Sequence, residues 1–158
     1  LHDHGRDADG EVKSWGRNSR LDNLQAAILN HRITGYDQII SRRRAIAAMY
    51  QQQLSDMEEL QLPPAPDADP DHFDIYQNYE LQADNRDELK QYLFDNGIGT
   101  LIQWGGKAVH QWEYLGFLTK LPKVERFFER CIMLPMNMFI DDDDVSYICE
   151  KIRAFYRK

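Results

Sequence analysis

The sequence predicts an α+β domain in which helices cover one face of a small antiparallel or mixed sheet, preceded by a long helical region. Two observations favour this class. Apolar residues recur at steps of three, four or seven over residues 21–57 and again in later stretches, which is the spacing of a buried helix face. Over residues 73–83 apolar and polar positions alternate instead, as they do in a half-exposed strand. Helices and a few strands of this kind bury their apolar sides as two stacked layers.

The first helical region is expected to extend from about residue 21 to residue 57. Its buried face is marked by Tyr36, Ile40, Ala47, Tyr50, Leu54 and Met57. Gly35 interrupts the region, and because glycine is unfavourable inside a helix we expect a kink or a break there. A proline-rich connector at residues 63–70 ends the region, since proline cannot continue a helix.

A strand, a helix and a second strand are expected next. In the strand at residues 73–83, one side carries Phe73, Ile75, Tyr79 and Leu81. A helix begins after Asn85, which forms a capping-box pattern with Glu88, and Gly97 closes it. Residues 99–104 then form a short strand.

Two further helices flank a last strand. Pro122 suits the first turn of a helix whose apolar side carries Val124, Phe127, Phe128 and Cys131. A short apolar strand is expected at residues 132–136. The final helix is capped by the four aspartates 141–144, and its core face carries Val145, Ile148, Cys149, Ile152 and Phe155. Because the aspartate run lacks the alternating ligands and glycine of an EF-hand loop, we interpret it as a cap and not as a calcium site.

Composition excludes several classes of protein. The chain has 158 residues and a formal net charge of -7, so it lacks the basic surface that a nucleic-acid partner requires. Its one basic cluster, residues 42–44, is expected to be a solvated helix face. No apolar run reaches the roughly 18–20 residues that cross a bilayer, so no membrane partner is expected. Cys131 and Cys149 lie on apolar helix faces, which indicates reduced core thiols and a cytoplasmic setting.

The most informative stretch is the loop and helix start at residues 15–29. Gly16 tolerates unusual backbone angles, and three residues that favour helix starts follow it, Asn18, Ser19 and Asp22. Free N–H groups and the helix dipole make such a start a possible anion site. Most capped helix starts bind nothing, so the pattern alone leaves both interpretations open.

The residues of this stretch resemble a segment of a known protein family. His4-Gly5 and the run Asn18-Ser-Arg-Leu-Asp-x-Leu-Gln-Ala-Ala27 resemble the join between the large and small domains of the DegT/DnrJ/EryC1/StrS aminotransferases. The similarity continues through Asn85-Arg86-Asp87, residues 97–100 and Leu134-Pro135-Met136, and so covers essentially the whole chain. The Asn18–Ala27 block is the specific part of the match.

The resemblance implies the C-terminal small domain of a fold-type I, aspartate-aminotransferase-like enzyme that uses pyridoxal 5'-phosphate. Residues 1–20 would be an interdomain lead-in and residues 21–158 the small domain. The intact enzyme would be a cytoplasmic homodimer that moves an amino group, from glutamate, onto a nucleotide-linked keto-sugar. Asn18 would reach the cofactor phosphate of the neighbouring subunit. The Schiff-base lysine of the family lies upstream of the His-Gly pair, so the chain alone is expected to be inactive and to hold no catalytic residue.

A second candidate segment follows at residues 100–112. Gly105 and Gly106 allow a turn or a close approach to a ligand, Trp104 offers a flat surface, and Lys107 and His110 offer hydrogen-bond donors. A packed turn with its aromatic residues in the core is the alternative. The resemblance implies a substrate wall from Gln103 to His110, although Gln103, Trp104 and Gly105 replace the family's histidine, tyrosine and proline.

Two other functions remain open. A stand-alone remnant could dimerise or bind a partner without catalysis. A related branch of the same family dehydrates sugars and carries a histidine in place of the lysine. An unrelated α+β module would require the Asn18–Ala27 match to be chance.

Overall fold

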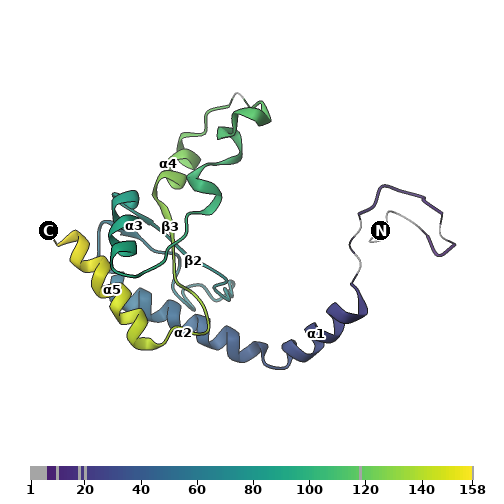
Figure 1. Cartoon of the computed structure of the whole chain (residues 1–158), viewed down its shortest axis with the longest axis horizontal. Helices are drawn as coiled ribbons and strands as arrows, with labels where there is room; N and C mark the ends of the chain where they lie inside the picture. Colours follow the sequence, from purple (N-terminus) through teal and green to yellow (C-terminus); the bar gives the residue numbers. More distant parts are fainter. Residues whose placement is uncertain (1–6, 10, 18, 20, 118, 158) are drawn as a thin grey trace. The chain divides into compact units, whose positions relative to one another are not determined.

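A computed structural model describes residues 7–9, 11–17, 19, 21–117 and 119–157 (Figure 1). The chain divides into two compact units, Leu1–Asp37 and Gln38–Lys158. Helix α1 (Asn23–Ile33) lies in the first unit, and α2 (Tyr36–Leu54) extends into the second. The break predicted at Gly35 is therefore confirmed, and the helical region ends at Leu54 rather than at residue 57.

Helix α1 buries none of its residues. Its start is held by the backbone N–H of Asp22, which donates to Oε1 of Gln25 at 3.3 Å. Leu21, Leu24 and Ile28, which recur at helical spacing at the start of the helical region, are all exposed. No helix in the described part of the chain is long and apolar enough to cross a bilayer.

The second unit is built on an antiparallel sheet of three strands in the order β1-β2-β3 (Figure 1). These are β1 (Leu60–Gln61), β2 (Tyr79–Ala83) and β3 (Cys131–Leu134). Tyr79 lies opposite Leu134 and Leu81 opposite Ile132, so these four residues share one face of the sheet. The antiparallel form of the predicted sheet is thereby established for the described residues.

Helices α2, α3 (Arg86–Asp95) and α5 (Asp142–Tyr156) contribute to one core on that face. The fully buried side chains include Ile46, Tyr50, Leu54, Leu89, Leu93, Val145, Cys149 and Ile152. Tyr50 also carries a polar atom into the core, and its hydroxyl donates to the carbonyl oxygen of Pro135 at 2.8 Å. Burial raises the pKa of Tyr50, so it stays a neutral donor. The predicted core face of α5 is confirmed from Val145 to Ile152.

The predicted strand at residues 73–83 is too long, because β2 begins only at Tyr79. Tyr76 has a φ of 51°, which no strand residue adopts. Its N–H donates to Oδ1 of Asp74 at 2.7 Å, the local side-chain bond that competes with a strand ladder. Phe73, predicted to face inward, is 69% exposed.

The second predicted strand and one predicted cap also differ from the structure. In residues 99–104 only Leu101 pairs with β3, through two hydrogen bonds to Met133, and the chain then turns into the 3₁₀ helix η1 (Gln103–Gly106). Asn85 precedes α3 with a φ of 50° and makes no side-chain cap, so the capping box with Glu88 does not form. Gly97, at a φ of 78°, closes α3 as predicted.

Helix α4 (Pro122–Arg130) begins at Pro122 as predicted but buries none of its residues. Cys131 does not belong to this helix: it is the first residue of β3, fully buried and paired with Gln82. Both cysteines are free and buried, as predicted. Burial raises the pKa of the Cys131 thiol and raises that of Cys149 to about 12, so both stay protonated at neutral pH.

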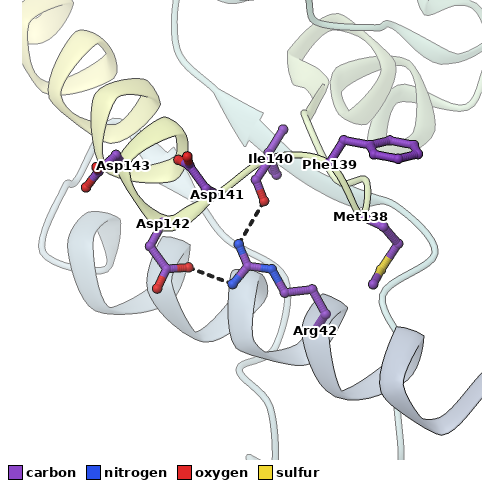
Figure 2. A pocket seen from close by; sticks show the side chains of 7 residues that line it. All are labelled: Arg42, Met138, Phe139, Ile140, Asp141, Asp142 and Asp143. Carbon is purple, nitrogen blue, oxygen red and sulfur yellow. Dashed lines mark hydrogen bonds and ion pairs between the residues drawn. The ribbon is translucent and has the colours of Figure 1, made fainter.

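The basic cluster at residues 42–44 is not a solvated face. Arg42 donates from Nη2 to the carbonyl oxygen of Ile140 at 2.8 Å and pairs with Asp142 at 2.6 Å, as Figure 2 shows. Arg43 donates to the carbonyl oxygen of Tyr76 at 2.9 Å. All three arginines are partly buried, because each reaches from α2 to carbonyl oxygens of a neighbouring loop.

Candidate functional site

The second candidate segment, residues 100–112, begins the stretch of chain that leads from Leu101 to β3. This stretch consists of η1, two further 3₁₀ turns, η2 (Val109–Gln111) and η3 (Glu113–Leu115), and helix α4. In Figure 1 this green part of the chain extends beyond the sheet, away from α2 and α5. The segment from Gln103 to Gln111, called here the substrate segment, holds all the predicted substrate residues: Gln103, Trp104, Lys107 and His110.

The backbone of the substrate segment turns through three consecutive left-handed residues. Trp104, Gly105 and Gly106 have φ values of 51°, 64° and 74°. This conformation explains the glycine pair, but it is strained for a tryptophan. The Trp104 side chain is 73% exposed, so the strain is not offset by burial of the indole. Strain of this kind at an exposed aromatic residue is a reason to look for function.

Arg86 lies close to this turn, and sequence reasoning gave it no role. Its side chain is 9% exposed and donates from Nη1 to the carbonyl oxygens of Phe128 at 3.1 Å and Cys131 at 2.9 Å. A Cβ atom on Gly106 would lie 3.4 Å from Nη2 of Arg86, so the turn passes close to this guanidinium. The Asn85-Arg86-Asp87 match was the signal that could have identified it.

Lys107 and Gln103 make contacts on either side of the turn. The Nζ atom of Lys107 lies 5.4 Å from the ring centre of Trp112, within the range of a cation–π interaction. Nε2 of Gln103 lies 3.8 Å from the sulfur of Met133, a weak hydrogen bond that ties the segment to β3. Lys107 remains exposed beside Trp112, where a phosphate or hydroxyl group could reach it.

His110 pairs with a carboxylate. Its Nε2 lies 3.0 Å from Oε1 of Glu125, and only 10% of its side chain is exposed. The same oxygen accepts the backbone N–H of Leu121 at 2.9 Å. The Leu121 N–H and then the His110 bond lower the pKa of Glu125, so this carboxylate is ionised at neutral pH. Glu125 was not predicted from the sequence.

The cap interpretation of residues 141–144 is borne out. Asp144 donates its N–H to Oδ1 of Asp141 at 2.8 Å, and Asp141 donates to Oδ2 of Asp144 at 3.1 Å. No group of His, Cys, Asp and Glu side chains among the described residues could hold a metal ion. In the hollow lined by Arg42 and residues 138–143 (Figure 2), the guanidinium is already paired with Asp142, and this pairing disfavours a second anion there.

Asn18 lies outside the described residues, so the predicted contact with a cofactor phosphate stays a prediction. Three described lysines make contacts within the chain: Lys13 pairs with Glu11, Lys151 lies 3.7 Å from Glu150, and Lys107 lies beside Trp112. No catalytic step is assigned to them.

Comparison with known proteins identifies the family of the chain. A sequence model of the DegT/DnrJ/EryC1/StrS aminotransferase family matches residues 1–153. A pleiotropic regulatory protein of Geobacillus stearothermophilus is 32% identical over 145 residues, which are 90% of this chain and 39% of the relative. A dTDP-3-amino-3,4,6-trideoxy-alpha-D-glucose transaminase of Streptomyces venezuelae is 29% identical over 159 residues, 98% of this chain and 41% of the relative. The chain thus spans about two fifths of the length of these relatives.

Solved structures are similar over the whole chain. S. venezuelae DesV, in complex with a ketimine intermediate, superposes with a TM-score of 0.87 at 28% identity and covers 100% of this chain and 43% of its own. A DegT DnrJ EryC1 StrS aminotransferase from Brucella abortus gives a TM-score of 0.81 at 28% identity, over 98% of this chain and 41% of its own. The α+β arrangement is therefore part of the fold of these aminotransferases. Because the family match extends over nearly all of its residues, the chain belongs to the DegT/DnrJ/EryC1/StrS aminotransferase family.

Proposed function

We propose that the chain is the C-terminal portion of an enzyme that transfers an amino group to a nucleotide-linked keto-sugar. Pyridoxal phosphate would supply the chemistry as an electron sink, and a lysine outside this chain would hold it. Glutamate is the proposed amino donor and a homodimer the proposed assembly. Residues 21–158 would be the small domain and residues 1–20 the lead-in to it.

The observation that carries the proposal is the full-length similarity to sugar aminotransferases. The transaminase of S. venezuelae and the UDP-2-acetamido-2-deoxy-3-oxo-D-glucuronate aminotransferase of Pseudomonas aeruginosa each align with more than nine tenths of the chain. Both names describe amino transfer to a sugar that is linked to a nucleotide. The sugar itself differs between these relatives, so the proposal stops at the class of substrate.

The substrate segment supports this class of ligand chemically. An exposed indole at Trp104 can stack on a sugar or base, and the ammonium group of Lys107 can pair with a phosphate. His110 and Gln103 supply polar groups for hydroxyls. Asn18 is proposed to donate to the cofactor phosphate of the neighbouring subunit, because a side-chain amide at a helix start suits an anion.

Two other functions compete with this proposal. The first is a non-catalytic stand-alone remnant that dimerises or binds a partner; one relative, 32% identical, is named as a pleiotropic regulatory protein. The second is the dehydratase branch of the family, which would carry a histidine in place of the lysine. Neither alternative changes the fold.

The sequence encoded directly upstream of Leu1 separates the three functions. A cofactor-binding domain with a lysine motif before His4-Gly5 supports the aminotransferase. A histidine at that position would indicate a dehydratase. A stop codon or an unrelated sequence would leave the binding remnant, and every cofactor and substrate role proposed above would fall.

A further inference from the structure

Glu125 holds the substrate segment to α4. Its Oε1 atom accepts two hydrogen bonds, from the Leu121 N–H at 2.9 Å and from Nε2 of His110 at 3.0 Å. The first bond joins the carboxylate to the residue that precedes its own helix, so Glu125 has one fixed orientation. The imidazole that meets this oxygen is therefore held at one place and angle.

The chemistry of Glu125 determines where the His110 proton lies. An ionised carboxylate can only accept hydrogen bonds, so the nitrogen that faces it must carry a proton. In the neutral imidazole that nitrogen is Nε2, and Nδ1 is left with a free lone pair. The two-donor environment keeps Glu125 ionised at neutral pH, since both donors lower its pKa.

Nδ1 of His110 is available to a ligand. No hydrogen bond from Nδ1 to a described residue is present. Among the described residues, the only side-chain nitrogen or oxygen atom that is fully buried and has no hydrogen-bond partner is Nε of Arg130. Nδ1 of His110, which also has no partner among these residues, is therefore not fully buried. A side chain that is nine tenths buried thus keeps one polar edge open, on the segment that carries Trp104 and Lys107.

We propose that Glu125 is a positioning residue of the substrate segment: it keeps the His110 proton on Nε2 and leaves Nδ1 as an acceptor for a substrate hydroxyl. This inference rests on the proposed function, because that function identifies the group that donates a hydrogen bond to Nδ1 as a hydroxyl of the substrate. The tautomer and the orientation of His110 are properties of this chain and can be measured without substrate.

Nuclear magnetic resonance on the full-length protein that contains this chain, labelled with ¹⁵N in its imidazole rings, tests this directly. His110 is identified by its absence from H110Q. At a pH at which imidazole is neutral, we expect the proton on Nε2 and slow exchange of that proton with water. A proton on Nδ1 would overturn the inference, and so would exchange of the Nε2 proton as fast as in a free imidazole. The wild-type protein is sufficient for this test.

Two variants then test whether Glu125 is what holds the His110 proton on Nε2. E125Q removes the obligate acceptor, and we expect exchange of the Nε2 proton to accelerate at least about tenfold, with both tautomers present. E129Q removes the same charge from the exposed side of the same helix and should leave the His110 signals unchanged. Unchanged His110 signals in a folded E125Q chain would also overturn the inference. If the tautomer is as expected but the intact enzyme transfers no amino group, only the proposed function fails.

Discussion

Nη1 of Arg86 donates to the carbonyl oxygen of Cys131 at 2.9 Å and thereby ties the first turn of α3 to the point where α4 gives way to β3. The same nitrogen bonds to the carbonyl oxygen of Phe128 at 3.1 Å. Gly106 of the substrate segment passes close to this guanidinium. Arg86 therefore links α3 to the end of α4 and lies beside the substrate segment.

Replacing Arg86 should destabilise the domain more than removing a surface charge. We expect R86A to lower the free energy of unfolding by about 2–4 kcal/mol, because two carbonyl oxygens in a largely buried site lose a charged donor. Urea unfolding followed by circular dichroism measures this. R126A, on an exposed position of α4, is the matched control and should change stability by less than about 0.5 kcal/mol. Equal effects of the two variants would contradict this role of Arg86.

Tyr50 and Tyr147 each donate a hydrogen bond from the side-chain hydroxyl to a backbone carbonyl oxygen, and the two can be compared. Tyr50 is fully buried and donates to Pro135, whereas Tyr147 is 43% exposed and donates to Asn96 at 3.1 Å. Y50F should cost about 1–2 kcal/mol, because the carbonyl of Pro135 loses its buried donor. Y147F should have almost no effect, since water replaces the lost bond. The two unfolding midpoints in urea provide the comparison, and a larger loss for Y147F would show that the assignment of the core bond is wrong.

The pKa of Glu125 should respond to His110. In the wild-type chain it should lie below its ordinary value of 4.5, mainly through the Leu121 N–H and then through His110. H110A should raise it only partway back, since the Leu121 bond remains. The stabilisation from this carboxylate is present above its ordinary pKa and is lost as the pH falls through the lowered value, so H110A loses less stability in acid.

Carboxyl ¹³C shifts followed during an acid titration provide this pKa. H72A is the control, because His72 bonds to Asp69 in an exposed loop far along the sequence from Glu125. A Glu125 pKa that is identical in the wild-type chain and in H110A would remove His110 as a partner of this carboxylate.

Asn18 is predicted to matter for cofactor retention rather than for folding. In the intact enzyme, N18A should weaken pyridoxal-phosphate binding about ten- to a hundredfold, the loss expected for one hydrogen bond to a charged group. Cofactor loss during dialysis, followed by absorbance, measures this. N30A, at an exposed position of α1, is the control. An equal loss of thermal stability in the apo form of N18A would mean that Asn18 supports the fold instead.

Much of the fold could be predicted from patterns within single elements. The stripe from Val145 to Ile152, the break at Gly35 and the cap formed by Asp141 depend on residues a few positions apart, and the structure confirms each of them. The extent of β2 could not be predicted in this way. Asp74 bonds to the N–H of Tyr76 and ends the alternation before the sheet begins, although the apolar spacing continues.

The interactions that could not be predicted from the sequence are those between residues far apart along the chain. Arg42, Arg43 and Arg44 look like a surface cluster until the loops that they bind are placed beside α2. Glu125 resembles any first-turn glutamate until His110 is folded against it. Trp104, Lys107 and His110 were singled out by their side-chain chemistry beside the glycine pair and Gln103 by a family resemblance, whereas the contacts of Gln103, Lys107 and His110 required coordinates.

Amino transfer by the complete protein tests the central claim most directly. The purified enzyme, encoded by the whole reading frame that contains this chain, would be incubated with glutamate and a nucleotide-linked keto-sugar, and the products identified by mass spectrometry. The account predicts a nucleotide-linked amino sugar and an equal amount of 2-oxoglutarate, at a rate that depends on added pyridoxal phosphate. Loss of water from the sugar with no consumption of glutamate, or no reaction with any of the keto-sugars that the relatives use, would contradict it.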